Sequence, residues 1–103
     1  MLLVPVPVLL LALFVSRLLA LAGAGARVEA TRSRPWASAT FVGAQHFVTL
    51  VVPADGAQAL ALALPDATFR IAGHIVADAV VDSREVHPAG ERMEIAVLTI
   101  EEW

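Results

Sequence analysis

The first 26 residues constrain this chain most, because a nearly uncharged apolar run fits only a few environments. Residues Leu2–Ala26 read LLVPVPVLLLALFVSRLLALAGAGA and contain one charged side chain, Arg17. A membrane-spanning helix needs about 20 mostly apolar residues. The regular helix is predicted from about Val6 to about Ala22, with two prolines at its start, where a missing N–H costs little. We therefore expect residues 1–26 to form a hydrophobic transmembrane helix or a signal segment.

Three environments remain open for this run. A retained anchor would place Arg17 inside the bilayer, where its guanidinium would pair with an acidic group of another subunit or reach toward the nearer interface. A signal peptide would be cleaved near Ala26, after the small residues Ala24-Gly25-Ala26. A helix buried in a soluble domain is the third environment, and the lack of a polar face argues against it.

The charges beside the run predict its orientation. No Lys or Arg precedes it, whereas Arg27, Arg32 and Arg34 follow closely. The positive-inside rule then makes the chain a single-pass membrane protein with its C-terminal domain in the cytoplasm. Cleavage near Ala26 would give the opposite result, an exported or periplasmic domain. The lack of cysteine mildly favours the cytoplasm, because small exported domains often need disulfides.

The residues after the run are predicted to form a juxtamembrane linker and one small β domain. Residues 27–37 are polar and charged, which is typical of a linker, and residues 38–103 alternate short apolar segments with turn residues. In the last of these segments Met93, Ile95 and Val97 are expected to face the core, with Arg92 and Glu94 on the other face. The expected strands are Ala39–Val42, Gln45–Val52, Thr68–Ile71, Ile75–Val81 and Glu91–Ile100, with Gly43 as a turn or bulge and turns at Pro53–Gly56 and His87–Gly90.

Residues Ala57–Leu64 read AQALALAL and give two conflicting signals. Leucine at every second position predicts a strand, whereas Ala and Leu are among the strongest helix formers. We favour the strand, because the run is short and Pro65 ends it. The expected fold class is then mainly β with one N-terminal hydrophobic transmembrane helix, the β part being a small β-barrel or β-sandwich of about five or six strands.

The second half of the chain also carries a pattern of turns and strands found in one membrane-protein family. Its elements are Leu64-Pro65, Phe69-Arg70-Ile71-Ala72-Gly73, Asp78-Ala79-Val80, and Val86 followed by Gly90-Glu91-Arg92-Met93-Glu94-Ile95. In these residues the stretch from Gly56 to about Ile100 resembles the OB-type β-barrel domain of NfeD-like membrane proteins. The resemblance implies a barrel beside membrane helices and a stomatin/prohibitin-like partner. A looser likeness, through Phe47–Pro53 and Pro88-Ala89-Gly90, is to exported immunoglobulin-like sandwiches.

Few side chains in this sequence suggest chemistry. His46, His74 and His87 do not have the spacing of a metal-ligand motif, and no G-x-S-x-G nucleophile motif occurs. Asp78 and Asp82 flank an apolar strand end and are better explained as solvated surface. The net charge is −3, and the only basic segment is the one that follows the apolar run, which argues against nucleic acid as a partner. We therefore expect no catalytic residue, no cofactor and no metal site, and we expect that the protein is not an enzyme.

The sequence as a whole predicts a non-catalytic, single-span accessory or scaffold subunit that joins a larger membrane protein complex through its helix and its β domain. Arg17 is the candidate contact to a partner inside the membrane. Arg27, Arg32, Arg34 and Trp36 are the candidate contacts to lipid at the membrane interface, although Trp36 could instead cap the domain core. The alternative function is an exported soluble β-sandwich with a binding or structural role.

Overall fold

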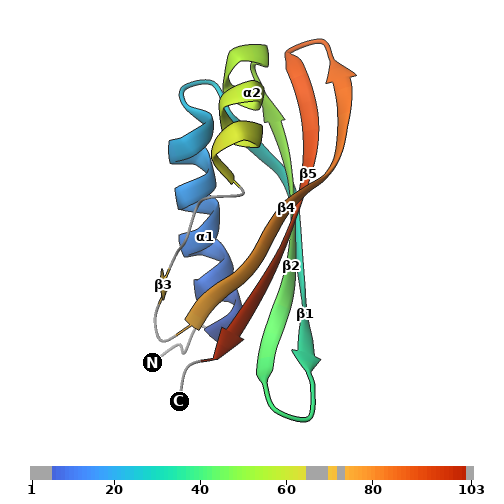
Figure 1. The fold of residues 1–103 in the computed structure, drawn as a ribbon. Helices are drawn as coiled ribbons and strands as arrows, with labels where there is room; N and C mark the ends of the chain where they lie inside the picture. Colours follow the sequence, from blue (N-terminus) through green and yellow to red (C-terminus); the bar gives the residue numbers. More distant parts are fainter. Residues whose placement is uncertain (1–5, 65–69, 72–73, 102–103) are drawn as a thin grey trace.

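The chain folds into one antiparallel β-sheet with two helices on one of its faces (Figure 1). The computed structural model describes residues 6–64, 70–71 and 74–101. The mainly β class that the sequence predicts is confirmed. The elements in chain order are α1 (Val6–Ala22), β1 (Arg27–Ala37), β2 (Val42–Val52), α2 (Ala54–Ala63), β3 (Arg70–Ile71), β4 (His74–His87) and β5 (Gly90–Glu101).

The strands form one open sheet in the order β1-β2-β5-β4-β3, and every neighbouring pair is antiparallel. β3 contributes only Arg70 and Ile71, which pair with the start of β4. The described strands neither close on themselves nor form a second sheet, so the expectation of a β-barrel or a β-sandwich was wrong. The physical reason is that α1 and α2 cover the apolar face that closure or a second sheet would otherwise have to bury.

Helix α1 has the bounds that the sequence predicts, and it packs on the sheet through one stripe of side chains. Phe14, Leu18 and Ala22 are spaced four residues apart and are buried in the core with residues of β2 and β5. Arg17 lies on the exposed side of the helix. The described part of α1 therefore packs on the sheet although the helix lacks a polar face, because the sheet needs only one side of the helix and the other side can stay apolar.

Across residues 6–64, 70–71 and 74–101, no helix has both the length and the apolar character needed to cross a membrane. The predicted N-terminal transmembrane helix is therefore not supported. The small residues after it, which the sequence offers as a cleavage site, form the link to β1. Gly23 and Gly25 adopt positive φ values of 84° and 86° there, and the Gly23 N–H donates to the Leu19 carbonyl at 3.0 Å, which ends α1.

Strand β1 occupies residues 27–37, where the sequence predicts a linker, and that prediction was wrong. Its backbone pairs with β2 from Arg27 opposite Val51 to Ala37 opposite Val42. The segment escapes prediction because β1 lies at the sheet edge, where both faces can carry polar side chains and a proline such as Pro35 is tolerated. The strand predicted over Ala39–Val42 does not form, because a turn closed by a hydrogen bond from Ser38 N–H to Phe41 O occupies most of it. The strand predicted over Gln45–Val52 begins earlier, at Val42.

Helix α2 corrects a second prediction, the strand over the AQALALAL segment. Ala57, Leu60 and Leu64 are buried at spacings of three and four, whereas Leu62 between them is 69% exposed. Helical periodicity therefore decides which leucines enter the core. The sequence hides this because Leu60 and Leu64 satisfy a period of two as well as a spacing of four.

The remaining strands agree with the sequence in their main features. Met93, Ile95 and Val97 of β5 face the core, and the β4–β5 turn falls at the predicted place. Strand β4 continues beyond the predicted end at Val81 to His87, with register irregularities between Val76 and Asp78 and between Val81 and Ser83. Gly43 is neither a turn nor a bulge: it lies inside β2, where a Cβ atom would come within 1.8 Å of the Thr99 carbonyl oxygen. The part of the predicted strand before Arg70 lies outside the described residues.

Candidate functional site

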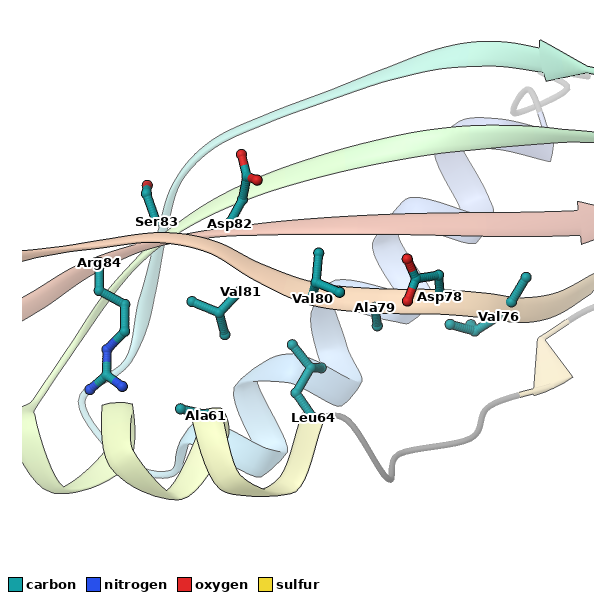
Figure 2. A pocket seen from close by; sticks show the side chains of 11 residues that line it. Ala61, Leu64, Val76, Asp78, Ala79, Val80, Val81, Asp82, Ser83 and Arg84 are labelled. Carbon is teal, nitrogen blue, oxygen red and sulfur yellow. The ribbon is translucent and has the colours of Figure 1, made fainter.

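One face of the sheet carries no element of the described chain, and we call it the open face (Figure 1). Residues opposite each other in an antiparallel pair share a face, so the register assigns its members. They include Arg27, Arg32, Arg34 and Trp36 of β1, Gln45, Phe47 and Thr49 of β2, Arg92, Glu94, Ala96 and Leu98 of β5, and Asp78, Val80, Ser83 and Glu85 of β4; Figure 2 shows Asp82 on the same side of β4.

Phe47 stands at the centre of the open face between two shallow hollows. One hollow, of about 120 Å³, is bordered by Phe47, Val80, Ala96 and Leu98 among others. The second, of about 100 Å³, is bordered by Phe47 and Glu94 among others. Because Ala96 lies directly beside Phe47 in the register, the surface alternates a large ring with a small side chain and is not flat.

The four residues predicted as membrane-interface contacts gather on this face. Arg27, Arg32, Arg34 and Trp36 are opposite Val51, Phe47, Gln45 and Gly43 of β2, respectively. Trp36 is half-buried on the open face and does not lie in the core. Arg17, by contrast, belongs to α1, in the helix layer on the opposite side of the sheet.

Two of these arginines are held against the aromatic centre. The Cζ atoms of Arg32 and Arg34 lie 4.2 Å and 5.7 Å from the centroid of the Phe47 ring, within the range of a cation–π interaction. The Arg34 Nε–H also donates to Gln45 Oε1 at 2.6 Å. The β1 side of the open face is therefore a basic edge with defined side-chain positions.

The β4 side of the same face is acidic. Asp78 and Asp82 of β4 and Glu94 of β5 are exposed, and Figure 2 shows both aspartates on the side of β4 away from α2. Asp78 lies in the same row across the sheet as Arg34, three strands away. The open face thus runs from a basic edge through an apolar centre to an acidic edge. The sequence indicates only solvated surface for these aspartates, because residues 34 and 78 come to lie in one row only when the sheet forms.

A separate ion cluster satisfies the charges at one end of the open face. Arg92 donates from Nε to Glu29 at 2.8 Å and from Nη1 to Glu85 at 2.7 Å. The hydrogen bond from Arg92 lowers the pKa of the Glu29 carboxyl. Arg27 Nη1 also lies 3.9 Å from Glu29 Oε2. Two arginines and two glutamates therefore balance one another at this end of the sheet, and we assign it a structural role.

A buried polar row crosses the opposite, helix-covered face. His46 has an exposed fraction of 0%; its Nδ1 lies 2.7 Å from Ser33 Oγ and its Nε2 lies 3.1 Å from Thr99 Oγ1. Thr99 donates its own proton to the Ala44 carbonyl at 3.3 Å. Thr99 therefore accepts from Nε2–H, and Ser33 donates to Nδ1.

This arrangement places a hydroxyl beside an imidazole, but the far end of the row is a backbone carbonyl and not a carboxylate. The described residues contain no group of three or more His, Asp or Glu side chains that could hold a metal ion. Of the other histidines, His74 begins β4 and His87 accepts a hydrogen bond from Ala89 N–H at 3.0 Å through Nδ1. The row is best explained as the means of satisfying polar groups in the core.

A cavity of about 620 Å³ lies between α2 and β4 (Figure 2). Ala61 of α2 and Leu64, which directly follows the helix, point toward Val81 and Arg84 of β4 across it. The Arg84 guanidinium is already paired, because its Nε and Nη2 donate to the two carboxylate oxygens of Glu91, each at 2.7 Å. The lining mixes polar and apolar atoms, but Asp78 and Asp82 point away from α2. The cavity therefore offers few polar side chains to orient a ligand.

Comparisons with known proteins add no identity to this geometry. No family model matches the chain, and neither a curated protein nor a solved structure is similar to it at a significant level. The resemblance to NfeD-like proteins and the stomatin/prohibitin-like partner that it implies therefore stay predictions from the sequence alone.

Proposed function

We propose that this chain is a small non-catalytic interaction domain, an accessory or scaffold subunit that docks on another protein through the open face. The observation that supports this most is the composition of that face. It places an aromatic ring and adjacent hollows between a basic and an acidic edge, and no described residue covers it.

The chemistry of the open face fits a protein better than other partners. Protein interfaces are enriched in aromatic residues and arginine at their centres and carry charged rims that align the partners. The acidic edge formed by Asp78, Asp82 and Glu94 would repel a nucleic acid. Val80 borders the hollow of about 120 Å³ and is 42% exposed, so it adds apolar area that binding would remove from water.

The proposal is tested by photo-crosslinking in the cells that make the protein. A photoreactive amino acid at position 80 of the open face should give a crosslinked protein product of defined mass. The matched control is position 62, because Leu62 is 69% exposed but lies on α2 in the helix layer. Equal crosslinking from both positions, or no protein product from position 80, would contradict the proposal.

Contact with an anionic membrane surface is a second candidate function, supported by one specific observation. Arg27, Arg32, Arg34 and Trp36 share one face of β1, and arginines with tryptophan are typical of headgroup contacts. We expect the full chain to co-sediment with vesicles rich in phosphatidylserine and not with phosphatidylcholine vesicles. An Arg32→Glu/Arg34→Glu variant that binds as the wild type does would contradict this second candidate.

A further inference from the structure

We propose that the partner of the open face is a second copy of this chain, packed face to face about a two-fold axis. This inference rests on the proposed function and names the protein that docks there. In such an interface, if one residue of the first copy contacts a second residue of the other copy, the same contact occurs again with the two copies exchanged. The open face must therefore be complementary to itself, both in charge and in side-chain size.

The charges select one orientation of the axis. An axis across the strands would stack β1 on β1 and bring the basic edges together, with Arg34 near Arg34 of the second copy. An axis parallel to the strands, between β2 and β5, stacks β1 on β4 and keeps the rows at the same height. Arg34 of each copy then lies over Asp78 of the other, whereas Arg32 lies over Val80, two residues before Asp82. The second orientation therefore forms one directly opposed pair of opposite charges, Arg34 with Asp78, at each side of the interface.

The same axis gives complementary shapes at the centre. It places β2 of each copy over β5 of the other, so Phe47 lies over Ala96 twice, because the two residues share a row. The hollow of about 120 Å³ beside Ala96 provides room for the incoming ring. Two sheets packed in this way lie about 10 Å apart with their strands nearly aligned.

The size of the open face predicts a reversible dimer and not a permanent one. Four strands at about 4.8 Å spacing, each contributing about nine residues at about 3.3 Å, cover on the order of 600 Å² per copy. A standard specific interface buries about 800 Å² per partner. We therefore expect dissociation to be measurable in the micromolar range.

The test uses charge exchange between Arg34 and Asp78, both at exposed positions. Arg34→Asp and Asp78→Arg should each place like charges in both pairs and raise the dimer dissociation constant at least tenfold, measured by sedimentation velocity of the full chain. An equimolar mixture of the two variants should recover the dimer, because positions 34 and 78 are then both acidic in one copy and both basic in the other. Asp55→Arg is the matched control, since Asp55 is exposed on α2 and should leave the dissociation constant unchanged.

Each outcome decides the inference. Circular dichroism must first show that the variants are folded, and the mixture then serves as an internal check, since only a folded pair can recover the dimer. A wild-type chain that stays monomeric at several hundred micromolar, a dimer that both exchanges leave intact, or a mixture that stays monomeric would overturn it. If position 80 crosslinks to a protein of a different mass while the chain alone is monomeric, the proposed function stands and only the second copy is excluded.

Discussion

Replacing Leu18 with alanine should destabilise the fold strongly, because the side chain is sealed between α1 and the sheet. Leu18 is 0% exposed and belongs to the core cluster. A Leu→Ala change at such a site removes buried apolar area and leaves a cavity, with a typical cost of about 3–5 kcal/mol. The whole domain has a stability on the order of 5–15 kcal/mol, so this one change would remove a large part of it.

Leu13 supplies a matched control in the same helix. It is 41% exposed, so its truncation to alanine should cost less than about 1 kcal/mol. Both substitutions are Leu→Ala inside α1, so their small effects on helix propensity cancel in the comparison. The difference in unfolding free energy between the two variants therefore reports how deeply each leucine of α1 is buried.

Urea unfolding of the full chain, followed by circular dichroism, measures this difference. With a slope of about 1.5 kcal/mol per M, Leu18→Ala should lower the midpoint by about 2–3 M, and Leu13→Ala by less than about 0.7 M. Equal midpoint shifts for the two variants would refute the packing of α1 on the sheet. Such a result would favour the anchor or the signal peptide, in which neither leucine contacts the β domain.

Three further predictions concern the sheet. Gly43→Ala should lower the melting temperature sharply in a thermal scan, since a Cβ atom would clash with the Thr99 carbonyl oxygen at 1.8 Å; an unchanged melting temperature would contradict the close approach of β2 and β5. Thr99→Val should cost about 1–3 kcal/mol in chemical unfolding, because it leaves the buried Nε2–H of His46 without that acceptor, whereas a neutral effect would mean that the hydrogen bond is not formed. The hydrogen bond from Arg84 lowers the pKa of Glu91 in the folded state. The stabilisation that this ion pair gives is therefore present above the ordinary carboxyl pKa near 4.5 and is lost as the pH falls through the lowered value. Glu91→Gln should make the stability fall less steeply at acid pH than in the wild type, and an unchanged dependence on pH would contradict the ion pair.

Local patterns were enough to predict several elements. Two prolines at the start of the apolar run, Pro5 and Pro7, and two glycines near its end, Gly23 and Gly25, predicted the bounds of α1 at Val6 and Ala22, because proline suits a helix start and glycine a helix end. Strict alternation in β5 identified Met93, Ile95 and Val97 as core residues. These predictions succeeded because each depends on the conformational preference or periodicity of one short segment.

The predictions that failed depended on neighbours that a local pattern does not contain. Residues 27–37 became a strand because β2 offers them a backbone partner, although their side chains suggest a linker. The AQALALAL segment became a helix because the core takes Leu60 and Leu64 and leaves Leu62 outside. In both cases tertiary contacts outweighed a weak or ambiguous local signal.

The candidate surface shows the same division. The sequence singled out Arg32, Arg34 and Trp36, but it could not place them on one face with Asp78, which lies more than forty positions later in the chain. By itself the sequence determined where apolar and polar residues fall along the chain, and hence the bounds of α1 and, within a residue, those of β5. Only the tertiary structure decided what covers the apolar side chains of the helices and the sheet. The physical reason is that strand order and register join segments that are remote in the chain, and these pairings place α1 on one face of the sheet and leave the opposite face open.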